Sequence, residues 1–78
     1  MKRQWLPMSY HHTLGYWLVI EDDTGYMMDC EKWFELYLGE NEGVVCRLEL
    51  GRHWYIVMGS EGVELTLRKD RTYKINLI

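Results

Sequence analysis

The chain has little of several features, and each shortage excludes a class of protein. It holds one proline and two cysteines in 78 residues, and no uninterrupted apolar run is longer than five residues. A membrane-spanning helix needs about 20 apolar residues, so none is predicted and no membrane partner is expected. The basic residues 1–3 are followed by Gln4, Pro7 and Ser9 rather than by an apolar stretch. We therefore expect no signal peptide and a cytoplasmic location.

The two cysteines are too few and too far apart for a disulfide framework or a zinc ribbon. Cys30 and Cys46 lie sixteen positions apart. In the cytosol they are expected to be small buried hydrophobic residues. Cys46 is in phase with Val44 and Leu48, so its side chain is predicted to face the core. No cofactor and no metal is predicted.

What the sequence does contain is a series of short segments in which apolar side chains recur at every second position. Successive side chains of a strand point to opposite faces, so this period indicates a sheet with one packed face. The clearest cases are Phe34, Leu36 and Leu38, then Val63, Leu65 and Leu67, then Tyr73, Ile75 and Leu77. An apolar fraction of 47% is ordinary for a globular protein and excludes a disordered chain.

Turn residues divide the chain into seven predicted strands with no helical stretch between them. We expect residues 1–13 to form an N-terminal arm, with an edge strand as an option, and residues 14–78 to form a single small domain. Short connections indicate an antiparallel meander. The predicted fold is all-β, with about five to seven strands closing into an SH3-like barrel, an OB-like barrel or a two-sheet roll being the alternatives. The predicted strands are residues 15–20, 26–28, 33–38, 44–50, 54–58, 63–68 and 72–78.

The second face of this sheet is too apolar for a face in contact with water alone. The predicted inward residues are Tyr16, Leu18, Ile20, Phe34, Leu36, Leu38, Cys46, Leu48, Trp54, Ile56 and Met58. The opposite phase then holds Trp17, Trp33, Tyr37 and Tyr55, with Val19, Val45 and Val57. The N-terminal arm, with Trp5, Leu6, Met8 and Tyr10, could cover part of this face. Otherwise Trp17, Trp33, Tyr37 and Tyr55 form a surface that binds a protein partner or a second copy of the chain.

An alternative function follows from the uneven charge. Residues 1–43 hold three basic and eight acidic side chains, whereas residues 44–78 hold six basic and four acidic ones. Arg47, Arg52, Arg68 and Arg71 could follow the backbone of a single-stranded nucleic acid while nearby aromatic rings stack on its bases. The net charge of −3 argues against this alternative.

No group of residues indicates catalysis, and the protein is not predicted to be an enzyme. His11 and His12 are neighbours, so on a strand their side chains point to opposite faces and make a poor metal site. Cys30 and His53 carry no signature of a nucleophile and its base. The acidic pair Asp22-Asp23 lies in a predicted turn, where carboxylates are expected in any case.

Four sets of residues from position 26 onward resemble a known family. They are Cys30 with Phe34 and Glu35, then Arg47-Leu48-Glu49, then Trp54-Tyr55, then Leu65-Thr66-Leu67-Arg68. They resemble a family of short uncharacterised bacterial proteins, found mainly in Firmicutes and mobile elements and classed as a domain of unknown function. The chain departs from that family at Glu31-Lys32, where a glycine followed by an acid is more usual. The resemblance implies a small cytosolic bacterial β-protein with no assigned role.

Overall fold

The computed structural model describes residues 4–78 and folds them into one antiparallel sheet of eight strands. The all-β prediction is confirmed, and the seven predicted strands are all present within one or two residues of their expected ends. The eighth is the first strand of the chain. The strands are β1 (Leu6–His11), β2 (Tyr16–Glu21), β3 (Thr24–Met28), β4 (Trp33–Gly39), β5 (Glu42–Leu50), β6 (Trp54–Met58), β7 (Val63–Thr66) and β8 (Tyr73–Leu77).

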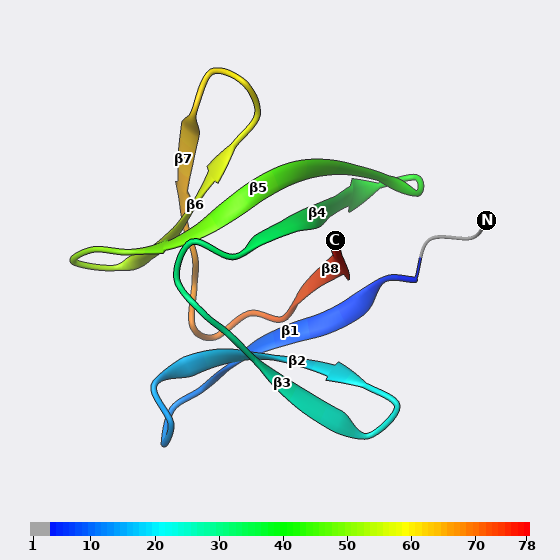
Figure 1. The fold of residues 1–78 in the computed structure, drawn as a ribbon, viewed down its shortest axis with the longest axis vertical. Coiled ribbons are helices and arrows are strands. Elements are labelled where there is room, and N and C mark those ends of the chain that lie inside the picture. The colour runs from blue at the N-terminus through cyan, green and yellow to red at the C-terminus, as the bar shows by residue number, and fades with distance from the viewer. Residues whose placement is uncertain (1–3) are drawn as a thin grey trace.

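The sheet consists of two meanders joined by the last strand. Its order is β3-β2-β1-β8-β4-β5-β6-β7, so β1–β3 form one meander and β4–β7 form the other (Figure 1). Strand β8 lies between them and pairs with β1 on one side and with β4 on the other. Ile75 is opposite Leu6 in the first ladder and opposite Leu36 in the second. The C-terminal strand therefore holds the two halves in one sheet.

The sheet does not close into the predicted SH3-like or OB-like barrel. Strands β3 and β7 are the two edges of the sheet and are not paired with each other. The sheet nevertheless curls until distant strands touch, because the ring of Tyr16 on β2 lies 6.1 Å from that of Trp54 on β6. Side-chain packing between the halves thus encloses the core without a closed ring of backbone hydrogen bonds.

The predicted N-terminal arm is part of the sheet. Strand β1 pairs with β2 and β8, so it is an inner strand and not an edge strand. Leu6 and Met8 point into the core, which explains why this segment is held between two neighbours. Residues 1–3 of the predicted arm lie outside the described residues.

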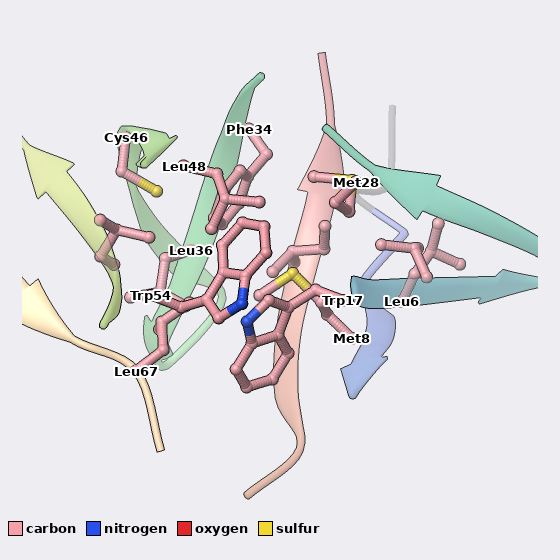
Figure 2. Close-up of a cluster of buried hydrophobic side chains, with 13 residues drawn as sticks. Leu6, Met8, Trp17, Met28, Phe34, Leu36, Cys46, Leu48, Trp54 and Leu67 are labelled. Atoms are coloured by element: carbon pink, nitrogen blue, oxygen red, sulfur yellow. The ribbon is translucent and has the colours of Figure 1, made fainter. Parts of the chain in front are cut away.

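The core lies on the concave face, and its centre is shared by both meanders (Figure 2). Trp17 of β2 and Trp54 of β6 occupy the middle of this cluster. The predicted inward phase is confirmed for β4–β6, except that Leu38 at the end of β4 is exposed. The buried residues are Leu6, Met8, Trp17, Val19, Met28, Phe34, Leu36, Cys46, Leu48, Trp54, Ile56, Leu67 and Ile75.

The predicted phase of β2 is wrong. Trp17 and Val19 are fully buried, whereas Ile20 is exposed and belongs with Leu18 to the opposite face; Tyr16, at the start of the strand, is 37% exposed and reaches Trp54. The register of the neighbouring strand is the reason. Val19 lies opposite the buried Met8 of β1, and opposite residues of an antiparallel pair share a face.

Candidate interaction surface

The outer face of β4–β6 carries apolar side chains that no other strand of residues 4–78 covers. Trp33 on β4 is 50% exposed and Val45 on β5 is 49% exposed. Tyr55 and the neighbouring Val57 on β6 are half-buried. The ladders place Trp33 in one row with Arg47 and Val57, because Arg47 is opposite both of them. Trp33, Val45, Tyr55 and Val57 are called the outer patch below.

Arg47 links the outer patch to the charged side chains that surround it. Its guanidinium carbon lies 5.5 Å from the centre of the Trp33 ring, which is a cation–π distance. Its Nε lies 3.5 Å from a carboxylate oxygen of Glu49. Among the described residues this Nε has no hydrogen-bond partner, although it is buried. The arrangement fixes the Trp33 ring beside a positive charge that is itself held by an acid.

Tyr37 lies on the same outer face but is partly covered by the N-terminal segment. The ring of Trp5 is 4.9 Å from that of Tyr37, and the Trp5 indole N–H donates a hydrogen bond of 2.9 Å to the Asn41 side chain. Gly43 makes room for this contact, since a Cβ there would lie 2.8 Å from the Trp5 ring. The Lys74 ammonium also lies near Tyr37, 5.7 Å from the centre of its ring. The expected cover of the outer face by the N-terminal segment is confirmed for Trp5. It is wrong for Leu6 and Met8, which are core residues, and for Tyr10, whose ring packs against the buried Trp17.

Trp17, which was predicted to belong to the surface, lies in the core instead. Its exposed fraction is 0%, and its ring packs edge-on against Tyr10 at 5.5 Å and Tyr73 at 5.7 Å. The indole N–H has no hydrogen-bond partner among the described residues. Trp17 therefore stabilises the fold and cannot contact a partner on the outer face.

The four arginines of the alternative prediction come from different parts of the sheet. Arg47 is on the outer face of β5, and Arg52 is in the turn after β5. Arg68 is paired with Asp70 at 3.1 Å. Arg71 lines a groove of about 390 Å³. The other side chains of this groove are Leu36, Tyr37, Thr72, Tyr73 and Lys74. Sequence reasoning did not single out Lys74 in this role, because its closeness to Tyr37 depends on the long-range pairing of β4 with β8.

The cysteines and histidines take structural positions. Cys30 is exposed, contrary to the expectation that both cysteines are buried, whereas Cys46 is buried. Burial raises the pKa of the Cys46 thiol to about 12, against the opposing effect of a hydrogen bond with the Leu36 backbone. The His11 ring accepts a hydrogen bond of 3.2 Å from the Leu14 N–H, and the His12 ring packs edge-on against Tyr10.

The described part of the chain contains neither a metal-binding group of side chains nor a membrane-spanning helix. Within residues 4–78, no three His, Cys, Asp or Glu side chains are grouped so that they could hold a metal ion. The same residues include no helix of the length and apolarity needed to cross a membrane.

The fold and the outer patch define a small all-β domain with an open, curled antiparallel sheet. The chain belongs to the family described as domain of unknown function DUF5348, whose model matches residues 7–77. Neither the curated proteins nor the solved structures contain a match to the chain.

Proposed function

We propose that the protein is a non-enzymatic interaction module that binds a protein partner through the outer patch. The observation that supports this is the pair Trp33 and Val45, whose side chains are both about half exposed on the outer face of adjacent strands. Tryptophan, tyrosine and arginine are the residues enriched at the energetic centres of protein interfaces, and here Arg47 lies against the exposed Trp33 ring. Of the predicted site residues, Trp33 and Tyr55 belong to the outer patch and Tyr37 lies at its border. Trp17 is a core residue and is not part of the proposed surface.

The charges around the outer patch favour a protein over a nucleic acid there. Glu35 lies opposite Val45, Glu49 opposite Tyr55, and Glu64 opposite Val57. These carboxylates would repel a phosphate backbone, whereas a protein surface of mixed charge can pair with them. The expected partner therefore presents an apolar centre flanked by both basic and acidic side chains.

The test compares two charge substitutions on the same outer surface. Trp33→Glu places a charge in the outer patch, and Ile20→Glu places one on the outer face of β2 at similar exposure. A protein captured from cells that carry the gene is purified, and its affinity for each variant is measured by calorimetry. Trp33→Glu is expected to weaken binding at least about tenfold while Ile20→Glu leaves it unchanged. Equal binding by wild type and Trp33→Glu would contradict the proposal.

Single-stranded nucleic acid is the second candidate, and the groove beside β8 is the observation that favours it. Arg71 and Lys74 line this groove together with Tyr37 and Tyr73, so cations and stacking rings occur in one place. Titration of a labelled oligonucleotide at several salt concentrations tests it. Affinity that falls steeply with salt and is lost on Lys74→Glu would support this function, and binding that is independent of salt would exclude it.

We also propose a cytoplasmic location and a bacterial source. Two cysteines without a disulfide support the location, because the exposed Cys30 thiol is stable in a reducing compartment. The bacterial source rests on the resemblance of the motifs between Cys30 and Arg68. Cell fractionation followed by immunoblotting checks the location.

A further inference from the structure

Strand β7 leaves one edge of the sheet open and exposes apolar side chains there. Val63 is 54% exposed and Leu65 is 40% exposed, although both belong to the concave, core-facing phase of the sheet. Val63 also lines an apolar groove of about 330 Å³ with Leu38, Val44 and Met58. An edge strand with apolar side chains and free backbone groups is a template for pairing with another strand.

The backbone groups that β7 presents at this edge can be identified from its ladder. The Leu67 N–H donates to the Trp54 carbonyl on β6, and Leu67 and Trp54 are directly opposite in the register. Hydrogen bonding alternates along an antiparallel strand, so Leu65 and Val63 also bond toward β6. Glu64 and Thr66 therefore direct their N–H and C=O groups away from the sheet.

The charges flanking the two edge strands differ, and only β7 is complementary to itself. Strand β7 is preceded by Glu61 and followed by Arg68 and Lys69, which remain exposed although Arg68 is paired with Asp70 and the Lys69 ammonium lies 4.8 Å from the Tyr10 ring. Antiparallel pairing of two β7 strands places the acidic end of one beside the basic end of the other, twice by symmetry. Strand β3 is flanked by Asp22-Asp23 on one side and by Asp29 on the other, so two β3 strands would set acid against acid.

We propose that β7 pairs antiparallel with β7 of a second copy of the chain, with Leu65 opposite Leu65 of that copy on the two-fold axis. Glu64 then exchanges two backbone hydrogen bonds with Thr66 of the other copy, and the symmetric pair exchanges two more. Val63 lies opposite Leu67 of the other copy in this register, next to the apolar groove. This joins two curled sheets edge to edge, on a surface separate from the outer patch.

Competing registers of this pairing are disfavoured by contacts within the chain. Moving the axis to Glu64 would place two carboxylates directly opposite each other. Moving it to Thr66 would require the Arg68 N–H for the ladder, but that group already donates to the Tyr73 hydroxyl at 2.9 Å. The register centred on Leu65 avoids both problems.

Disulfide cross-linking tests the pairing and its register together. Leu65→Cys is introduced with Cys30→Ser, because Cys30 is the exposed native thiol. Residues that face each other in a non-hydrogen-bonded antiparallel pair have Cα atoms about 4.5 Å apart, within the range that a disulfide spans. Under mild oxidation Leu65→Cys is expected to form a covalent dimer at least about tenfold faster than Val63→Cys, whose partner is Leu67. Equal rates for the two cysteines would overturn the proposal.

Two further variants separate this proposal from binding through the outer patch. By light scattering at concentrations up to the millimolar range, Leu65→Lys is expected to be a monomer and Tyr26→Lys on the β3 edge to dimerise like the wild type. Tyr26 is the matched control because it is a similarly exposed apolar residue of the other edge strand. Trp33→Glu in the Leu65→Cys protein should leave cross-linking unchanged. If Trp33→Glu abolishes it, the copies associate through the outer patch and the edge pairing is wrong.

Discussion

The two meanders differ in how their outer faces are built. On β4–β6 the outer phase alternates apolar side chains such as Trp33 and Val45 with the charged Glu35, Arg47 and Glu49. On β2 the outer face carries Leu18 and Ile20, and neither is charged. Charges on an outer face restrict which molecules can bind there, because a wrong partner leaves them unpaired. The difference explains why the outer patch is the better candidate for a specific interface, although both faces are apolar.

The largest effect is expected for a substitution in β8, the strand that joins the two meanders. Ile75 is fully buried and lies opposite a residue of each meander, so Ile75→Ala removes packing from both. A loss of about 2–5 kcal/mol in the free energy of unfolding is expected, which is a large part of the stability of a small domain. Urea unfolding followed by circular dichroism and by tryptophan fluorescence measures it.

The same experiment shows whether the two meanders unfold as one unit. Coincident transitions for the two probes are expected, because the core is shared across β8. Ile78→Ala is the control, since Ile78 is exposed and its truncation should change stability by less than about 0.5 kcal/mol. Two separate transitions in Ile75→Ala, only one of them shifted, would mean that the meanders are independent.

The assignment of faces on β2 gives a smaller and sharper test. Val19 is fully buried and Ile20 is 40% exposed, although the alternation alone gave the reverse expectation. Val19→Ala is expected to cost about 2 kcal/mol and Ile20→Ala less than about 1 kcal/mol. Thermal unfolding of the two variants side by side checks this. A larger loss for Ile20→Ala would reverse the inner and outer faces of the first meander.

The sequence predicts the inner face of a strand most directly where charged residues mark the outer one. The phase of β6, which holds no charge, is also predicted correctly. Glu35 on β4, and Arg47 and Glu49 on β5, reveal the phase of their strands, and there the predicted core is confirmed. Residues 16–20 contain no polar side chain, so either phase satisfies the pattern. Pairing with β1 decides it, through Met8, and β1 itself was predicted as an arm because Pro7 interrupts its pattern. Long-range pairing is the information that a local pattern lacks.

The residues of the outer patch could be predicted in part from the sequence. Trp33 lies on β4, whose phase is marked by Glu35, and Tyr55 lies on the uncharged β6, opposite Glu49 of β5; both are on the outer face as expected. Trp17 lies on β2, which also lacks a charge between residues 16 and 20, and its predicted face is wrong. The cover of Tyr37 depends on a contact between Trp5 and a hairpin 36 residues away, at Asn41. The sequence predicts that the apolar N-terminal segment covers part of the outer face. Which of its side chains do so depends on the order of the strands in the sheet.

The connection between the two meanders carries the smallest expected effect. Glu31 lies between β3 and β4 with a φ of 68°, in the left-handed region that favours glycine. The family that the motifs resemble more often has glycine at this position, and glycine adopts a φ of this kind without steric strain. The Glu31 N–H donates a hydrogen bond to the Leu48 carbonyl on β5. This bond holds the turn between β3 and β4 against the second meander.

Glu31→Gly is therefore expected to stabilise the protein by about 0.5–1 kcal/mol, because relief of the left-handed strain outweighs the added freedom of the unfolded chain. Such a gain raises the melting temperature of a domain of this size by a few degrees, which calorimetry resolves. Glu31→Ala keeps the Cβ and is the matched control, expected to leave the melting temperature unchanged. If Glu31→Ala stabilises as much as Glu31→Gly, the gain comes from removing the carboxylate, and the turn that joins the two meanders is not strained.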